Sequence, residues 1–194
     1  MRLDFFRDEL PECRMIEDED LRRLTLSAWD RACAIGRFDA ESLRTLPAHL
    51  SMRECPITLF EHVRSVTRIA VSLAEQLQRD FAATSPLHFD YVLSGALLHD
   101  IGKIVMAGAL SETRYAFAGH ARAGAMIAEE CGCPWQVAYI VANHSAVDGC
   151  SLVDMPELLV VRSADELCYR FQLFGYAAAE GNEAVARWQY KRWQ

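Results

Sequence analysis

Residues 97–103 read Leu97-Leu98-His99-Asp100-Ile101-Gly102-Lys103, and the rest of the chain is organised around this stretch. Residues 89–99, which lead into it, are apolar nearly all round, and this is typical of a helix buried in the middle of a domain. The His-Asp pair stands at the expected end of that helix, and we expect Gly102-Lys103 to turn the chain at once. Two side chains that can bind a metal therefore lie where the core ends.

Other side chains with the same capability fall on separate segments with helical periodicity. The segment from residue 56 to 77 carries apolar residues at spacings of three and four, and His62 lies on its core-facing stripe. We expect this helix to be the longest and to open at Cys55-Pro56, with the proline in its first turn. Three more expected helices, over residues 119–132, 134–145 and from 156 onwards, carry His120, His144 and Asp165.

Taken alone, each of these residues has a plainer interpretation; His62, for example, could be a hydrogen-bonded core histidine. Together, four imidazoles and two carboxylates form a mixed nitrogen and oxygen set, which suits iron, manganese, zinc, cobalt or nickel better than calcium or magnesium. The other two histidines, His49 and His88, stand in turn-like contexts, and we expect both to be exposed. The Cys131-x-Cys133 pair has no second pair at zinc-finger spacing, so we interpret it as two small buried side chains.

Composition indicates a globular protein of 194 residues, with 52% apolar and 24% charged residues. No apolar stretch approaches the ~18 residues of a spanning helix, and the first residues lack a signal-peptide core, so we expect a cytoplasmic protein without membrane contact. The seven cysteines are an odd number in apolar contexts, which favours reduced thiols. The net charge of -7 argues against binding extended nucleic acid, but a small anionic substrate can bind locally.

The chain divides into three expected parts. Residues 1–50 form an N-terminal helical extension, with one helix from about Glu19 to Gly36 and a short one that Asp39 caps. Residues 51–175 form the main domain, and residues 176–194 a C-terminal helical tail. Because no repeat and no run of alternating residues argues for a sheet, the predicted fold class is all-α. The aromatic tail and the segment around Trp29 are candidate surfaces for a homodimer.

The order H…HD…H…H…D, with its second element written L-L-H-D-I-G-K, resembles the HD-domain superfamily of metal-dependent phosphohydrolases. The resemblance covers about residues 56–175 and implies an HD-domain helical bundle with a binuclear metal site. It implies that one divalent transition metal binds His62, His99 and Asp165, that a second binds His120 and His144, and that Asp100 bridges both. It also places Lys103 near the substrate.

The resemblance implies hydrolysis of a phosphate mono- or diester in a small, nucleotide-like substrate, by a metal-bound water or hydroxide that attacks phosphorus. Lys103 would protonate the leaving group or stabilise charge in the transition state. No Gly-Tyr-Pro follows His144, where Asp148-Gly149-Cys150 stands instead, which argues against the cyclic-dinucleotide phosphodiesterases of the HD-GYP group. All six ligands are present, which argues against a purely regulatory relative.

Two alternatives stay open at the level of sequence. A smaller branch of the same superfamily consists of mixed-valent di-iron oxygenases, which cleave carbon–carbon or carbon–phosphorus bonds with O2 and have the same ligand order. Lys103 does not separate that branch from the hydrolases. The other alternative is a binding or signalling module whose metals serve structure alone.

Overall fold

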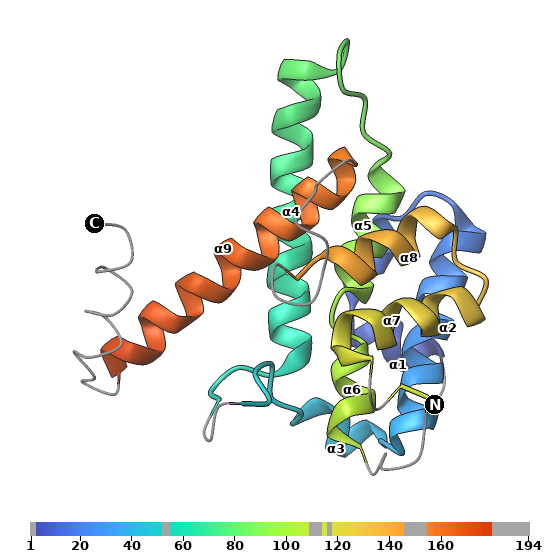
Figure 1. The fold of residues 1–194 in the computed structure, drawn as a ribbon, viewed down its shortest axis with the longest axis vertical. Helices are drawn as coiled ribbons and strands as arrows, with labels where there is room; N and C mark the ends of the chain where they lie inside the picture. The colour runs from blue at the N-terminus through green and yellow to red at the C-terminus, as the bar shows by residue number, and fades with distance from the viewer. Residues whose placement is uncertain (1–2, 52–54, 109–113, 116–117, 146–154, 180–194) are drawn as a thin grey trace.

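A computed structural model describes residues 3–51, 55–108, 114–115, 118–145 and 155–179 (Figure 1). Within these ranges the regular elements are helices and there is no β-strand; Pro47 and Thr58 form one isolated antiparallel bridge. The predicted all-α fold is confirmed. The elements in order are α1 (Leu3–Glu9), the 3-10 helix η1 (Pro11–Met15), α2 (Glu19–Gly36), α3 (Ala40–Arg44), α4 (Leu59–Phe81), α5 (Phe89–Leu98), α6 (Gly102–Ala107), α7 (Gly119–Glu130), α8 (Trp135–Asn143) and α9 (Pro156–Ala179).

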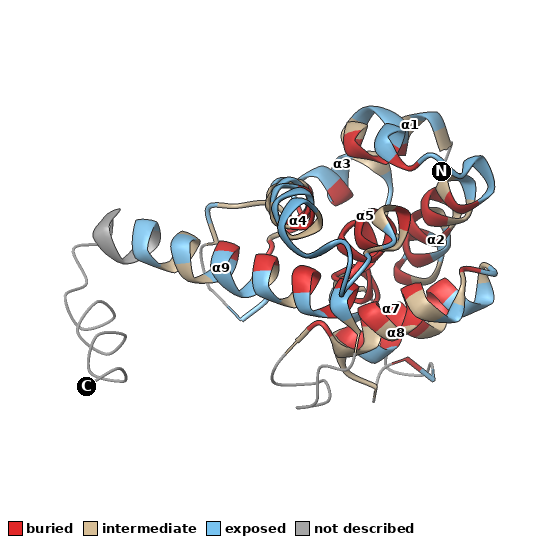
Figure 2. Cartoon of the chain, turned by 90° about the horizontal axis from the view of Figure 1, so that it is seen from above, coloured by how far each residue is buried: buried red, intermediate tan, exposed pale blue. Residues whose placement is uncertain are grey.

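Helix α5 lies at the centre of the fold, as its all-round apolar sequence predicts. It packs against α2, α4, α8 and α9, and most of its side chains are buried, whereas the outer face of α4 is exposed (Figure 2). Gly95 permits close packing against α8, because a Cβ atom there would lie 2.6 Å from a methyl carbon of Ile140. The helix therefore delivers the residues that follow it, His99 and Asp100, to a point between several helices.

Helix α4 begins later than we predicted from Pro56. Thr58 is the N-cap: its hydroxyl accepts from the backbone N–H of Glu61 (3.3 Å), and the Glu61 carboxylate accepts from the backbone N–H of Thr58 (2.8 Å). This capping box gives acceptors to the backbone N–H groups of Thr58 and Glu61, and a proline side chain has no acceptor to offer. The capping box therefore fixes Leu59 as the first helical residue. The prediction that α4 is the longest helix is also wrong, since it has 23 residues and α9 has 24.

Helices α2 and α3 form where the sequence predicts them, whereas α1 and η1 were not predicted. The Asp18 side chain caps α2, Asp39 caps α3, and α2 ends at Gly36 before Arg37, whose φ of 60° is left-handed. Helix α2 packs against α5, α6 and α7, and the indole N–H of Trp29 donates to the carbonyl of Leu97 (3.0 Å). The first fifty residues thus contact the end of α5 that carries His99 and Asp100.

Asp90 ties α5 to the segment before α2. Its carboxylate is buried and accepts from the backbone N–H groups of Glu17 (3.0 Å) and Asp18 (2.9 Å). We expect Asp90→Ala to lower the free energy of unfolding by about 1–3 kcal/mol, because two backbone donors lose their acceptor. Urea unfolding measures this change. The matched control is Asp80→Ala at the exposed end of α4, with an expected change within about 0.5 kcal/mol; equal effects of the two changes would contradict the assigned role.

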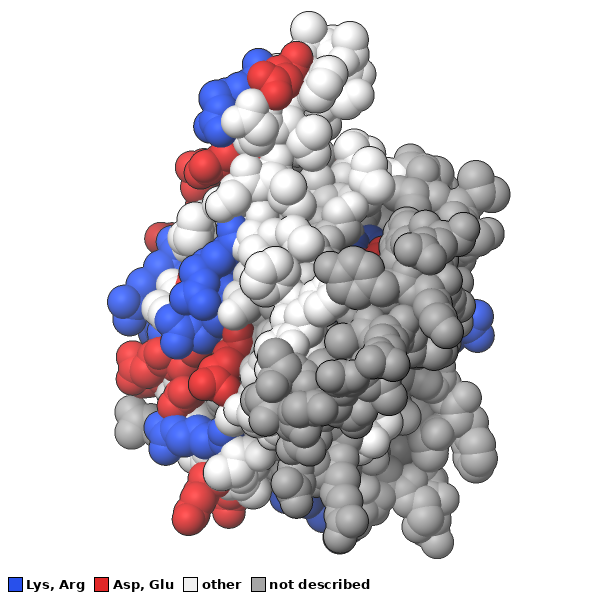
Figure 3. All heavy atoms as spheres, turned by 90° about the vertical axis from the view of Figure 1, so that its left-hand side faces the viewer, with Lys and Arg blue, Asp and Glu red and all other residues white. Residues whose placement is uncertain are grey.

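The surface of the described residues shows how the charged side chains of this acidic chain are distributed. On the face drawn in Figure 3, acidic and basic side chains are interspersed. Among the ion pairs of the described residues, Arg64 and Arg68 both pair with Glu12. Among the described helices, none combines the length and the apolar character that crossing a membrane requires. The predicted tail helix lies outside the described residues from residue 180 onwards.

Candidate metal centre

The structure brings together the side chains of all six predicted ligands. His62 lies in the first turn of α4, His99 and Asp100 directly follow α5, and His120 is the second residue of α7. His144 follows α8, and Asp165 lies in the middle of α9. The turn that we predicted at Gly102-Lys103 lies slightly earlier, over residues 99–101, and α6 begins at Gly102, so Lys103 is a helical residue.

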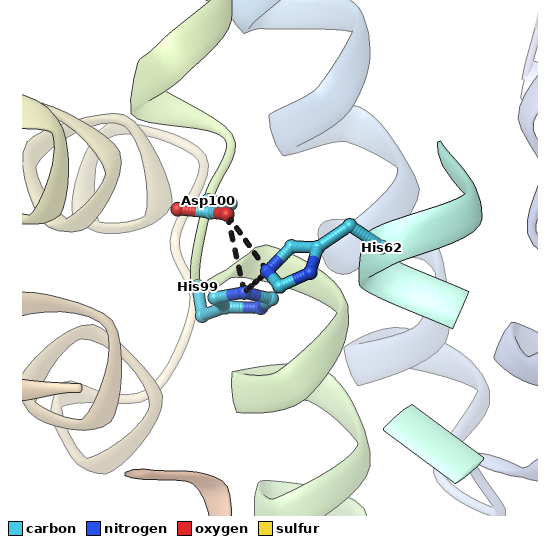
Figure 4. Close-up of side chains that lie close together, drawn as sticks. All are labelled: His62, His99 and Asp100. Carbon is cyan, nitrogen blue, oxygen red and sulfur yellow. Dashed lines mark hydrogen bonds and ion pairs between the residues drawn. The ribbon is translucent and has the colours of Figure 1, made fainter. Parts of the chain in front are cut away.

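One group of donor atoms surrounds one oxygen of Asp100. The Nε2 atoms of His62 and His99 lie 3.3 Å apart, and each lies 3.3 Å from Oδ2 of Asp100 (Figure 4). Oδ1 of Asp165 reaches the same two imidazoles, at 3.1 Å from Nε2 of His62 and 3.7 Å from Nε2 of His99. Two imidazoles and two carboxylates therefore face one point.

A second group surrounds the other oxygen of the same carboxylate. The Nε2 atoms of His120 and His144 lie 3.3 Å apart, at 3.5 and 3.7 Å from Oδ1 of Asp100. In each of the sets His62–His99–Asp100 and Asp100–His120–His144, the donor atoms lie within 4.8 Å of one another. Asp100 is the member that the two sets share.

The hydrogen bonds around the imidazoles fit a metal site. Nδ1 of His99 lies 2.7 Å from the carbonyl oxygen of Ala96, and Nδ1 of His144 lies 2.7 Å from that of Val141. A carbonyl oxygen only accepts, so Nδ1 carries a proton in both residues, and Nε2 is the ring nitrogen that remains to bind a metal. Nitrogen and carboxylate donors in this number suit divalent transition metals.

The electrostatics of the centre keep both carboxylates ionised. Burial raises the pKa of Asp100, but the Lys103 ammonium and the His99 imidazole outweigh it and hold that pKa well below its usual range. Burial likewise raises the pKa of Asp165, but its hydrogen bond with His62 and the nearby His99 and His144 imidazoles together outweigh that effect and lower the pKa to about 2. Both oxygen ligands are therefore in the state that binds a metal.

The histidines differ in charge. Burial and the neighbouring His99 lower the pKa of His144 to about 4, so this imidazole is neutral. Burial also lowers the pKa of His62, but its hydrogen bonds to Asp100 and Asp165 outweigh burial and raise that pKa well above its usual value. A metal that binds His62 must displace this proton.

Lys103 lies against the shared carboxylate. Its Nζ donates to Oδ2 of Asp100 (2.6 Å) and to the backbone carbonyl of Ala48 (2.8 Å), and its side chain is 15% exposed. The ammonium therefore lies beside the oxygen of Asp100 that faces His62 and His99, and the side chain retains some access to solvent. It also joins the segment before α4 to the centre.

His49 is buried, and the prediction that it is exposed is wrong. Its side chain packs edge-on against His62, with ring centroids 5.6 Å apart, and its Nε2 lies 3.2 Å from Oε1 of Gln172. Two backbone hydrogen bonds between the segments around Leu46 and Ile57 draw this irregular stretch along the start of α4. No periodicity signals such a placement in the sequence, so sequence reasoning missed both His49 and Gln172.

The prediction that His88 is exposed is confirmed, and the prediction that Cys131 and Cys133 are buried holds for Cys133 alone. His88 is exposed and stacks on Tyr91, with ring centroids 3.8 Å apart. Cys133 is buried and Cys131 half-buried, and neither belongs to the two sets of possible metal ligands among the described residues.

Comparison with known proteins gives one match. The family profile described as HD domain matches residues 59–169, which is more than half of the chain and includes all six residues of the centre. Searches of curated proteins and of solved structures found no match.

Proposed function

Because the chain belongs to the HD domain family, whose members are generally metal-dependent phosphohydrolases, we propose that it hydrolyses phosphate esters at a binuclear metal centre. The observation that carries this proposal is the position of Asp100, whose two oxygens face two separate pairs of histidines. A single-metal site needs no such arrangement. One carboxylate between two imidazole pairs matches the construction of two-metal hydrolytic sites.

The donor set defines the proposed cofactor and its ligands. We assign one divalent transition metal to His62, His99 and Asp165, a second to His120 and His144, and Asp100 to both. Iron, manganese, zinc, cobalt and nickel all suit these donors. When bound, such a pair supplies a water of lowered pKa as the nucleophile and neutralises charge on the phosphoryl oxygens.

The residues of the chain supply position and charge. Asp100 fixes the position of the two ligand groups relative to each other, because one of its oxygens faces His62 and His99 and the other faces His120 and His144. The ammonium of Lys103 lies directly beside this carboxylate. It can stabilise negative charge that develops on a phosphoryl oxygen, or donate a proton to the leaving group. The acidic net charge favours a small substrate, such as a nucleotide-like mono- or diester, over a long nucleic acid.

The experiment is a hydrolysis assay on the full chain after metal depletion and reloading. We expect the Mn²⁺-loaded protein to release nitrophenol from nitrophenyl phosphate or bis-nitrophenyl phosphate, and a chelator to stop the reaction. A protein that releases no nitrophenol after loading with each of the five metals in turn would contradict the proposal. Consumption of O2 by an iron-loaded protein with an organophosphonate or polyol, together with that failure, would favour the oxygenase branch.

Lys103→Met tests the proposed role of the ammonium. We expect kcat to fall about 100- to 1000-fold, because a charged donor aimed at the reacting group is lost. The metal content is expected to stay at two ions per chain, since Lys103 is not a ligand. Arg122→Met on the exposed face of α7 is the control and should leave kcat unchanged. A Lys103→Met protein with full metal content and unchanged kcat would contradict the role.

A further inference from the structure

Gln172 links two histidines that lie on the side of the centre nearest the C-terminal half of α9. Its Oε1 lies 3.2 Å from Nδ1 of His62 and 3.2 Å from Nε2 of His49, and its amide nitrogen donates to Sγ of Cys168 (3.3 Å). Neither Gln172 nor His49 falls within residues 59–169, the range that matches the HD domain profile. The family match therefore assigns no role to either residue.

The contacts of the Gln172 amide determine which nitrogen of His62 carries a proton. Because the amide nitrogen donates to Cys168, the oxygen is the atom that faces the two imidazoles, and an amide oxygen only accepts. Nδ1 of His62 must then be an N–H group. Its Nε2 is left to face Asp100 and Asp165.

Gln172 does for His62 what backbone carbonyls do for two other histidines of the centre. The Nδ1 atoms of His99 and His144 bond the carbonyls of residues three positions earlier in their own chain segments. His62 instead lies in the first turn of α4, and its Nδ1 partner comes from α9, 110 positions away in the sequence. A tertiary contact thus replaces a local one at this ligand.

We propose that Gln172 is a positioning residue that holds His62 in its metal-binding tautomer, with His49 as the second donor that fixes the Gln172 oxygen. The inference rests on the metal centre of the proposed function. Gln172 is not a ligand itself, because its oxygen contacts Nδ1, the nitrogen opposite the one that faces the carboxylates. His49 also packs edge-on against Tyr169, with ring centroids 4.9 Å apart.

The first measurement is the affinity of the full chain for Zn²⁺, by competition with a chromogenic chelator. Gln172→Met keeps the length of the side chain but removes the acceptor, and we expect one of the two sites to bind Zn²⁺ about 10- to 100-fold more weakly. Gln172→Glu keeps an acceptor and should bind at least as tightly as the unchanged protein. Gln76→Met, on the exposed face of α4, is the control and should have no effect.

The second measurement reads the tautomer directly. In Zn²⁺-loaded protein labelled with ¹⁵N-histidine, a long-range ¹H–¹⁵N spectrum should show His62 with a protonated Nδ1 and a metal-bound Nε2. We expect that signal to persist in Gln172→Glu and to be lost in Gln172→Met through exchange or a change of tautomer. A residue that serves only packing would not alter it. If Gln172→Met fails to fold, a Gln172→Glu protein with weakened Zn²⁺ binding still overturns the inference.

The outcomes separate this inference from the proposed function. Zn²⁺ binding and a His62 signal that are both unchanged in Gln172→Met would overturn the role of Gln172 alone. Binding of Zn²⁺ that depends on Gln172, without any phosphate ester hydrolysis, would overturn the proposed function alone. A wild-type protein that binds none of the five metals, Zn²⁺ included, would overturn both.

Discussion

Asp100→Asn is expected to remove both metal ions and all measurable hydrolysis at once. The asparagine side chain keeps the shape of the carboxylate, but it has no charged oxygen to bind a metal ion at either group of histidines. Since Oδ2 of Asp100 faces His62 and His99, and Oδ1 faces His120 and His144, one substitution affects both positions. Elemental analysis of metal per chain, with the nitrophenyl phosphate assay, measures the result.

Two further variants show whether the effect of Asp100 is that of a shared ligand. His120→Ala should remove one metal and leave the other, because His120 belongs to one group only. Asp80→Asn, at the exposed end of α4, should retain both ions. An Asp100→Asn protein that folds, by circular dichroism, and keeps two metal ions would contradict the assignment of Asp100 as the bridge.

Gly102→Ala is expected to destabilise the fold by about 3 kcal/mol or more. A Cβ atom at this position would lie 1.9 Å from the backbone oxygen of His120 and 2.8 Å from the backbone nitrogen of Gly124. Both contacts are with the backbone of α7, so no side-chain rotation relieves them, and α6 would have to move away from α7. Because His120 is one of the candidate ligands, metal binding should weaken as well.

The control for this change is the same substitution at Gly175. A Cβ atom there meets nothing within 4 Å, and alanine is favoured over glycine in a helix, so Gly175→Ala should stabilise the protein by up to about 1 kcal/mol. Thermal and urea unfolding of both variants measures the difference. A Gly102→Ala protein as stable as the Gly175→Ala protein would contradict the close packing of α6 on α7.

The sequence predicts the elements whose signals are local. Apolar periodicity and the caps Asp18 and Asp39 place α2 and α3, and the apolar run before His99 places the buried helix α5. The start of α4 shows how two local signals can compete. Pro56 suggests a first turn, but Thr58 and Glu61 form a capping box that is also readable in the sequence, and its hydrogen bonds decide the boundary.

The candidate site also has a part that the sequence predicts and a part that it does not. The convergence of His62, His99, His120 and His144 follows from the ligand order that resembles the HD-domain superfamily, and the structure brings these side chains together. His49 and Gln172 carry no pattern, because their placement depends on an irregular segment and on the packing of α9 against α4. Contacts between segments so far apart in the chain are decided by tertiary packing, which periodicity does not encode.

The most direct test of the account is Mn²⁺ titration of the metal-depleted full chain, followed by electron paramagnetic resonance at saturation. Because one carboxylate faces both ligand groups, the account predicts two Mn²⁺ ions per chain with the spectrum of an exchange-coupled pair, as expected for ions about 3.5–4 Å apart. Saturation at one ion per chain, or two ions with the spectrum of isolated Mn²⁺, would contradict a binuclear centre bridged by Asp100.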